Sequence, residues 1–211
     1  MSGGEAGNEA SPRRSYAKGV ARRSQIIESA IEEFADHGVD GTSLRTLGDA
    51  IGVSHATLRH YFATRDELLV EVYRAHEQNS VGEAFGSPMP EGESVVEAMA
   101  ASADRNSSIP GLVRLYATLS SDAVQAGHPV SEHFVRERFR GLRALLAEHI
   151  RAGQAAGDIA ADFEAEDAAA LVIAASDGLQ VQWLLDPDDV DVRRSLALLE
   201  RLLPGAEHDT K

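Results

Sequence analysis

The stretch GVSHATLRHYF, residues 52–62, decides the fold of the N-terminal part of the chain. Gly52 is suited to a tight turn, because glycine takes the left-handed conformation without a steric penalty. Ser54 then predicts a helix start, since its side chain accepts a hydrogen bond from a free backbone N–H of the first turn. Leu58 and Phe62 lie four positions apart and predict one buried face. The stretch therefore predicts a turn followed by a short helix with polar and basic side chains outside.

A second short helix is predicted immediately before this turn. Thr42 or Ser43 is suited to cap it, and Leu44, Leu47 and Ile51 fall on one of its faces. Two short helices joined by a tight turn follow the plan of a helix-turn-helix, in which the second helix enters the major groove of DNA. The sequence therefore predicts a DNA-binding element at this place.

Longer helices are predicted on both sides of the motif. Apolar residues recur at helical spacing over residues 22–37, and Gly38 is suited to end that helix. After the motif, Thr64 and Glu67 match a capping box, in which a hydroxyl and a carboxylate accept hydrogen bonds from backbone N–H groups. A fourth helix is expected to run from there toward residue 78.

The remaining sequence predicts an all-helical body. Proline, glycine and aspartate clusters separate five further expected helices, at residues 94–107, 111–125, 131–155, 164–185 and 190–203. The sequence contains no alternating strand pattern, internal repeat or long heptad register. The expected fold class is all-α with about nine helices: an N-terminal three-helix helix-turn-helix domain, then a C-terminal helical bundle.

Composition along the chain predicts its domain boundaries. Residues 1–16 are polar and glycine-rich and are expected to be a disordered arm. Residues 17–77 form the expected DNA-binding domain, residues 78–207 the expected ligand-binding and dimerisation body, and residues 208–211 a disordered tail. Three glycines and two prolines within residues 81–92 favour a connecting segment at this boundary.

Charge is distributed unevenly over the chain. The formal net charge is −14, but residues 11–65 carry eight basic residues against six acidic ones. From Val81 onward, eleven basic residues face twenty-two acidic ones. A weakly basic head on an acidic body suits a protein that binds DNA through one end only, although a solvated basic tail would also account for the N-terminal arginines.

The absence of cysteine and of long apolar segments limits the compartment and the chemistry that the sequence allows. The chain has no cysteine, which excludes disulfides and thiolate zinc sites and favours a reducing cytoplasm. The longest apolar run, residues 168–175, is shorter than the ~20 residues of a membrane helix, and the first residues lack the apolar core of a secretory signal. We therefore expect a cytoplasmic protein with no membrane contact, no cofactor and no metal site.

Three segments resemble the TetR family of bacterial repressors: TSLR at residues 42–45, GVSHATLRHYF at residues 52–62 and TRDELL at residues 64–69. The resemblance covers residues 22–73, whereas the body is similar to the family mainly in the number and length of its helices. It implies a DNA-binding repressor that dimerises through its body and is controlled by a small molecule.

The resemblance assigns DNA contacts residue by residue. Contacts with base edges are implied for Arg45 on the second helix and for His55, Ala56 and Thr57 on the third. The chemistry agrees, since arginine pairs bidentately with guanine and small apolar groups meet the thymine methyl. Phosphate contacts are implied for Ser43, Ser54, Arg59, His60, Tyr61 and Arg65. Two of these have an alternative interpretation, in which Tyr61 packs on the first helix and His60 is an unused surface imidazole.

Two residues depart from the family pattern. Arg59 stands where members usually carry tyrosine, so a phenol is replaced by a longer cation and a steeper salt dependence is expected. Gly48 stands where alanine is common, which loses ~1 kcal/mol of helix propensity unless close packing requires the missing methyl.

The body is expected to form a homodimer. Residues 164–185 are apolar over more than one face, so this helix needs a second burial surface. Together with residues 190–203 it would form a four-helix interface about a twofold axis, and DGLQ at residues 177–180 resembles the dimer-forming end of family members. A twofold dimer predicts double-stranded DNA with a palindromic operator, whose half-sites lie about 34 Å apart or slightly more.

A small-molecule effector of unknown identity is expected to bind between the helices of the body. The pocket candidates are mainly aromatic and apolar, with two polar partners: Met99, Leu112, Tyr116, His133, Phe134, Phe139, Gln180 and Trp183. Most of them suit ordinary core positions equally well.

Other function classes fit the sequence less well. Walker, nucleophile-elbow, zinc-protease and dinucleotide-binding motifs are absent from it, so an enzyme is not expected. The cluster of Asp188, Asp189 and Asp191 is better explained as capping charge at a helix start than as a metal site. A DNA-binding activator, or a regulator controlled by a protein partner, stays open as an alternative.

Overall fold

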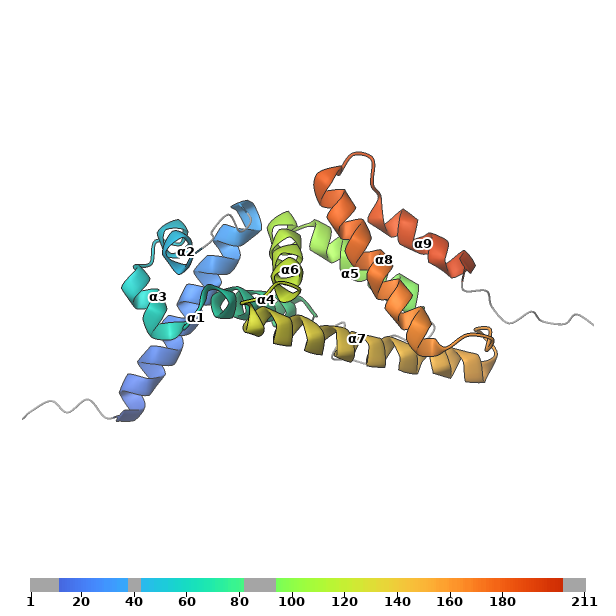
Figure 1. The fold of residues 1–211 in the computed structure, drawn as a ribbon, viewed down its shortest axis with the longest axis horizontal. Helices are drawn as coiled ribbons and strands as arrows, with labels where there is room; N and C mark the ends of the chain where they lie inside the picture. Colours follow the sequence, from blue (N-terminus) through green and yellow to red (C-terminus); the bar gives the residue numbers. More distant parts are fainter. Residues whose placement is uncertain (1–11, 38–42, 82–93, 203–211) are drawn as a thin grey trace, which may run out of the picture.

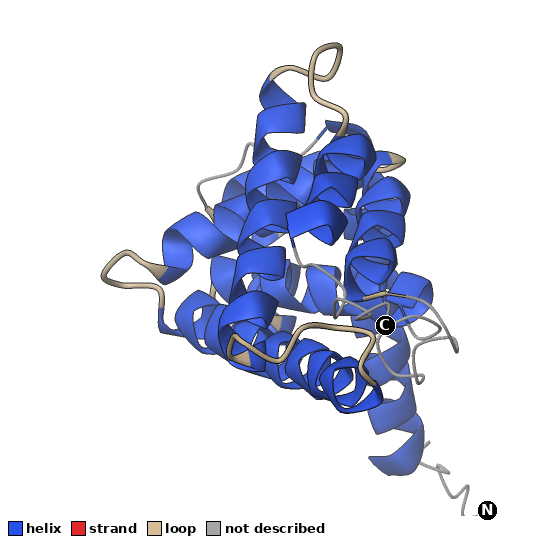
Figure 2. Cartoon of the chain, turned by 90° about the vertical axis from the view of Figure 1, so that its right-hand side faces the viewer, coloured by secondary structure: helices blue, strands red, loops and turns tan. Residues whose placement is uncertain are grey.

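Hydrophobic periodicity in the sequence corresponds to helices throughout the structure. The computed structural model describes residues 12–37, 43–81 and 94–202. Its helices are α1 (Pro12–His37), α2 (Leu44–Ala50), α3 (His55–Tyr61), α4 (Arg65–Val81), α5 (Val95–Ser107), α6 (Pro110–Ala123), α7 (Pro129–Ala156), α8 (Ala165–Leu185) and α9 (Val192–Leu202). Figure 2 shows only helices and loops in this described part, which confirms the all-α prediction.

The predicted helix bounds are accurate in the body and least accurate at α1. Each of the five body helices begins and ends within two residues of its predicted bounds. In contrast, α1 begins at Pro12 and takes in residues 12–16, which the sequence analysis assigned to a disordered arm. Proline is favoured at the first helical position. The residues that follow Pro12 lack the regularly spaced apolar side chains from which a helix is predicted. The predicted tail and most of the predicted connecting segment lie outside the described residues.

Two hydrophobic cores divide the molecule, and the division falls within α7. The first core joins α1, α2, α3 and α4 to α6 and the start of α7, and includes Phe34, Leu47, Leu58, Phe62, Leu69, Leu115, Phe134 and Val135. The second core joins α5, the later part of α7, α8 and α9, and includes Met99, Leu146, Ile150, Val172 and Leu196. Figure 1 shows α2 and α3 at one end of the molecule and α8 and α9 toward the other. The head therefore shares its core with α4 and α6.

A glycine allows α6 to begin directly against α1. A Cβ atom at Gly111 would lie 1.6 Å from the backbone carbonyl oxygen of Phe34, a distance that no side chain tolerates. Gly111 itself is buried. The close approach of these two backbones fixes α6, which is a body helix by sequence order, against the longest helix of the head.

Candidate nucleic-acid interface and ligand cavity

Serine caps begin both helices of the motif: Ser54 as the sequence predicts, and Ser43 as one of the two predicted candidates. The Ser43 hydroxyl accepts a hydrogen bond from the backbone N–H of Thr46 at 3.2 Å, and the Ser54 hydroxyl accepts one from Thr57 at 3.2 Å. Each cap satisfies an N–H group that has no partner within its own helix. Both short helices are thus stabilised by local bonds that their own sequences specify.

The turn between α2 and α3 depends on two glycines. Gly52 has a φ of 67°, the left-handed conformation that the sequence predicts. A Cβ atom at Gly48 would lie 2.5 Å from the carbonyl oxygen of Val53 and 3.1 Å from Cδ1 of Leu58. The backbone N–H of Val53 donates to the carbonyl of Gly48 at 2.8 Å, which closes the turn. Close packing therefore accounts for the glycine at position 48.

The inner faces of α2 and α3 are buried in the first core. Leu47, Leu58 and Phe62 are each at most 1% exposed, and Val53 fills the turn between the helices. Burial of a large apolar side chain contributes about 1.5–3 kcal/mol, so these contacts fix which side of α3 faces outward.

The outer faces of α2 and α3 carry most of the predicted DNA contacts. The exposed members are Ser43, Arg45, Ser54, His55, Ala56, Arg59 and His60, while Thr57 is half-buried. Among the residues described, neither Arg45 nor Arg59 has an ion-pair or hydrogen-bond partner for its guanidinium group. Both groups are therefore accessible to an anion.

Tyr61 and His60 lie at the edge of this surface. Tyr61 is half-buried and packs against the first core, which agrees with the alternative interpretation of its ring. The His60 ring meets the Tyr61 ring edge-on, with 4.8 Å between the ring centroids. The phosphate contacts predicted for both residues stay predictions.

Arg65 is the predicted DNA contact that the structure directs elsewhere. Its Nη1 lies 2.6 Å from Oδ2 of Asp122, at the end of α6, and 3.2 Å from Oδ1 of Asp66. The side chain is only 16% exposed. Two nearby carboxylates provide a partly desolvated partner for the cation, so Arg65 connects α4 to α6 where the sequence analysis expected a phosphate contact.

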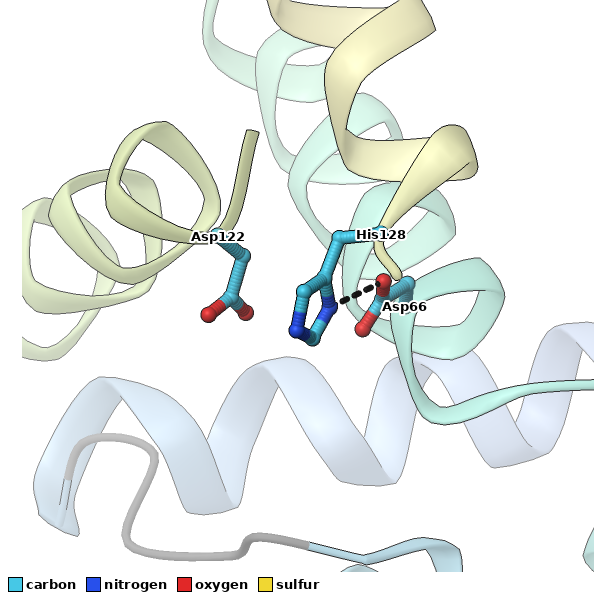
Figure 3. Close-up of side chains that lie close together, drawn as sticks. All are labelled: Asp66, Asp122 and His128. Carbon is cyan, nitrogen blue, oxygen red and sulfur yellow. Dashed lines mark hydrogen bonds and ion pairs between the residues drawn. The ribbon is translucent and has the colours of Figure 1, made fainter. Parts of the chain in front are cut away.

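His128, the N-cap residue of α7, joins the same cluster (Figure 3). Its Nδ1 lies 2.8 Å from Oδ2 of Asp66, and ligand atoms of Asp66, Asp122 and His128 lie within 4.8 Å of one another. Two carboxylates and an imidazole are groups that ligate divalent cations. Because Arg65 already supplies positive charge to both carboxylates, we interpret the cluster as a junction of α4, α6 and α7.

A cavity of about 380 Å³ lies among α4, α6, α7 and α8, with one residue of α5 at its wall. Four of the eight predicted pocket residues line it: Leu112, Tyr116, Phe139 and Gln180. The other four lie elsewhere: Met99 and Trp183 against the second core, Phe134 in the first core, and His133 on the surface. Hydrophobicity alone did not distinguish core from cavity wall.

A partly buried arginine, Arg138, belongs to the polar part of the cavity wall. The Cζ atom of Arg138 lies 5.5 Å from the ring centroid of Tyr73 and 4.9 Å from that of Tyr116. Its Nη1 donates to Glu77 on α4. An ion pair and two aromatic faces therefore replace much of the hydration that the guanidinium loses on burial.

Burial shifts the pKa values of the groups around Arg138. Burial, and then the charge of Asp177, raise the pKa of the Tyr116 hydroxyl to about 12. Burial also raises the pKa of the carboxyl groups of Asp177 and Glu77, against the opposing influence of Arg138. It lowers the pKa of the His76 imidazole. The surroundings thus disfavour the charged forms of the other titratable groups.

Arg138, Asp177 and His76 line the cavity but are not among the residues predicted from the sequence. Arg138 belongs to the segment RERFRGLR at residues 136–143, whose dense charge is typical of a solvated helix face. Asp177 had a detectable signal, because it is the only charged residue of the apolar segment 168–185. A single acid in such a helix is costly to bury and indicates a function or a specific partner.

Two family models match the chain on either side of the connecting segment. Residues 26–72 match the model described as bacterial regulatory proteins, tetR family, and residues 110–206 match the model described as BetI-type transcriptional repressor, C-terminal. The chain belongs to the TetR family. This TetR-family assignment confirms the resemblance seen in the motif and extends it to most helices that line the cavity.

Relatives align with this TetR-family chain over most of its length. The probable acrEF/envCD operon repressor of Escherichia coli is 23% identical over 198 residues, which are 90% of this chain and 89% of the relative. The HTH-type transcriptional regulator TtgR of Pseudomonas putida is 26% identical over 191 residues, 85% of this chain and 88% of TtgR. The solved SmeT–triclosan complex has the same fold, with a TM-score of 0.67 at 18% identity, covering 86% of this chain and 91% of that one.

Proposed function

We propose that this TetR-family chain is a cytoplasmic transcriptional repressor that binds a palindromic operator as a homodimer and releases it when a small molecule occupies the cavity. The shared first core carries this proposal. It packs α3, with its predicted base contacts, together with α4 and α6, which line the cavity. A ligand that displaces α4 or α6 would act on the helix-turn-helix through direct packing.

On the DNA side, we assign base reading to Arg45, His55, Ala56 and Thr57. The exposed guanidinium of Arg45 suits the bidentate pairing with guanine, and the exposed Ala56 methyl suits a thymine methyl. Phosphate contacts are assigned to Ser43, Ser54, Arg59, His60 and Tyr61. Arg65 is withdrawn from this set because Asp122 and Asp66 pair with it.

An exposed apolar stripe on α8 supports the homodimer. It consists of residues at alternating spacings of three and four: Leu171, Ala174, Gly178, Val181 and Leu185. Such spacing places all of them on one helix face, and none is charged. Among the described helices, α8 is the one long and apolar enough to cross a membrane by length and composition alone. We infer that a second copy covers this face, with α9 contributing the exposed Leu198.

The cavity supports control by a small molecule. Its volume of about 380 Å³ lies within the ~300–1,000 Å³ typical of small-molecule sites. The similar fold of SmeT was solved in complex with triclosan. To cause release, the effector must bind the released conformation more tightly than the DNA-bound one.

Selection of genomic fragments by the purified protein tests the proposed DNA binding. We expect a palindromic site, at which Arg45→Ala and Thr57→Ala each lose about 1–3 kcal/mol of base discrimination at one position. Arg114→Ala, on an exposed position of α6, is the matched control and should bind as the wild type does. Failure to enrich a palindrome, or unchanged base preference in both variants, would contradict the proposal.

An activator, or a regulator controlled by a protein partner, would share the DNA-binding half of this proposal. A thermal-shift screen of metabolites and drugs separates the cases. A compound that raises the melting temperature and weakens operator binding supports ligand control, whereas the absence of any such compound favours a protein partner. Both matching family models and the acrEF/envCD relative are described as transcriptional regulators.

A further inference from the structure

Asp177 carries the least compensated charge in the cavity wall. Its one hydrogen bond within the described residues comes from the hydroxyl of Tyr116, which donates to Oδ2 at 3.3 Å. That distance is long for a bond to a carboxylate, and the donor is neutral. A carboxylate in apolar surroundings is stabilised by charge-assisted hydrogen bonds or by a cation. Asp177 therefore has acceptor capacity that the described residues leave unused.

The other charge that lines the cavity, Arg138, is already compensated. Its Nη1 donates to Glu77, and the rings of Tyr73 and Tyr116 lie against the guanidinium. Its Nε–H has no hydrogen-bond partner within residues 12–37, 43–81 and 94–202. That atom is covered by protein, so a ligand in the cavity does not reach it.

The groups around the cavity leave one net negative charge. Arg138 and Glu77 cancel each other, and burial favours the neutral imidazole of His76 because it lowers the pKa of that group. Arg74 also acts on Glu77, but it is exposed and paired with Glu71 at 3.2 Å. The remaining charge is that of Asp177, whose carboxylate burial disfavours and Arg138 only partly stabilises. A cation at short range would stabilise this carboxylate further, whereas the carboxylate would repel an anion.

We propose that Asp177 selects a lipophilic cation, whose protonated amine donates to the Asp177 carboxylate while its apolar part lies against Leu112, Val113 and Phe139. An ammonium supplies the charge-assisted hydrogen bond that Tyr116 does not provide. The apolar side chains then exclude water from the ion pair and bind the rest of the molecule. The inference rests on the proposed ligand control and names the chemical class of the effector.

Three probes with the same decyl chain and different head groups test this class. Decylammonium, decanol and decanoate are titrated into the full chain at neutral pH, with heat of binding as the readout. We expect decylammonium to bind at least about tenfold more tightly than decanoate, with decanol between them. Equal or tighter binding of decanoate overturns the proposal, as does failure of decylammonium to bind.

Asp177→Asn removes the charge but keeps the size of the side chain and an oxygen that accepts from Tyr116. We expect it to weaken decylammonium binding about tenfold and to leave decanol binding unchanged. Asp167→Asn, an exposed acid in the first turn of α8, is the matched control and should leave all three affinities unchanged. If Asp177→Asn weakens the binding of decanol as much as that of decylammonium, Asp177 has a structural role and charge selection is contradicted.

These readouts are independent of DNA. If decylammonium binds as expected without weakening operator binding, cation selection is supported and ligand-controlled release fails. If decanoate binds more tightly and releases the operator, ligand control is supported and the cation class is overturned.

Discussion

Gly48 is the residue at which the α2–α3 turn is tightest. Gly48→Ala would gain ~1 kcal/mol of helix propensity, but its Cβ would lie 2.5 Å from a backbone oxygen of Val53. Accommodating such an overpacked group typically lowers the free energy of unfolding by about 1–3 kcal/mol. We expect a lower melting temperature by calorimetry, at ~2–4 °C per kcal/mol for a chain of this size.

The control for this prediction is Gly141→Ala on α7. Outside its chain neighbours and the adjacent helix backbone, no atom lies within 4 Å of a Cβ atom built there, so only the gain in helix propensity should remain. Its melting temperature is expected to rise slightly. Similar shifts in both variants would show that the contact with Val53 is not limiting.

Arg59 is the exposed cation that replaces a usual family tyrosine. Because each neutralised phosphate contributes ~0.9 to the slope of log affinity against log salt, Arg59→Tyr should reduce that slope by about this amount per half-site. Fluorescence anisotropy of a labelled operator at several salt concentrations measures it. Arg143→Tyr, at an exposed position of α7, should leave the slope unchanged. A wild-type slope in Arg59→Tyr would remove this residue from the phosphate contacts.

Between elements, the Arg65–Asp122 pair connects α4 to the end of α6. Arg65→Ala leaves two partly buried carboxylates without this cation, so we expect lower thermal stability and weaker operator binding. The loss of affinity should be equal at every salt concentration, because this arginine does not contact phosphate in our assignment. A slope reduced by ~0.9 would instead support the phosphate contact that the sequence predicts. Asp122→Asn should reproduce the stability loss and leave the slope unchanged.

The elements themselves could be predicted because their signals are local. Thr64 accepts from the N–H of Glu67 at 3.1 Å, as the capping box predicts, although the Glu67 carboxylate accepts from Ala63 at 2.7 Å, one residue before the expected donor. Contacts between elements were not predictable in this way. Arg65 and Asp122 are 57 positions apart, so no neighbour rule connects them.

The wall of the cavity could be predicted only in part, because it depends on contacts between helices as well as on residue type. Residue type identified Tyr116 and Phe139 as aromatic wall candidates, but it also selected Phe134, which packs in the core. The polar wall depends on Arg138 meeting Glu77 across two helices, which only the tertiary packing determines.

At the scale of the whole molecule, the apolar stripe on α8 predicts the oligomeric state. Leu171 is 54% exposed and does not line the cavity, so Leu171→Glu should place an unpaired charge in the proposed interface without changing a residue of the cavity wall. We expect monomers and weaker operator binding, measured by sedimentation and anisotropy, because burial of an unpaired charge costs several kcal/mol. Ala144→Glu, at an exposed position of α7, should remain dimeric. A dimeric Leu171→Glu variant would place the interface elsewhere.

Because α7 contributes residues to both cores, the two ends of the molecule pack against the same helix. Val135 lies in the first core, Leu146 lies in the second, and Phe139 packs against both. Loss of either core would remove the partner surface of a helix on which the other depends. We therefore expect one calorimetric unfolding transition with equal calorimetric and van't Hoff enthalpies, whereas two resolved peaks would indicate independent domains. A molecule that melts as one unit is stabilised throughout by any ligand of its native state, whether that ligand binds at α3 or in the cavity.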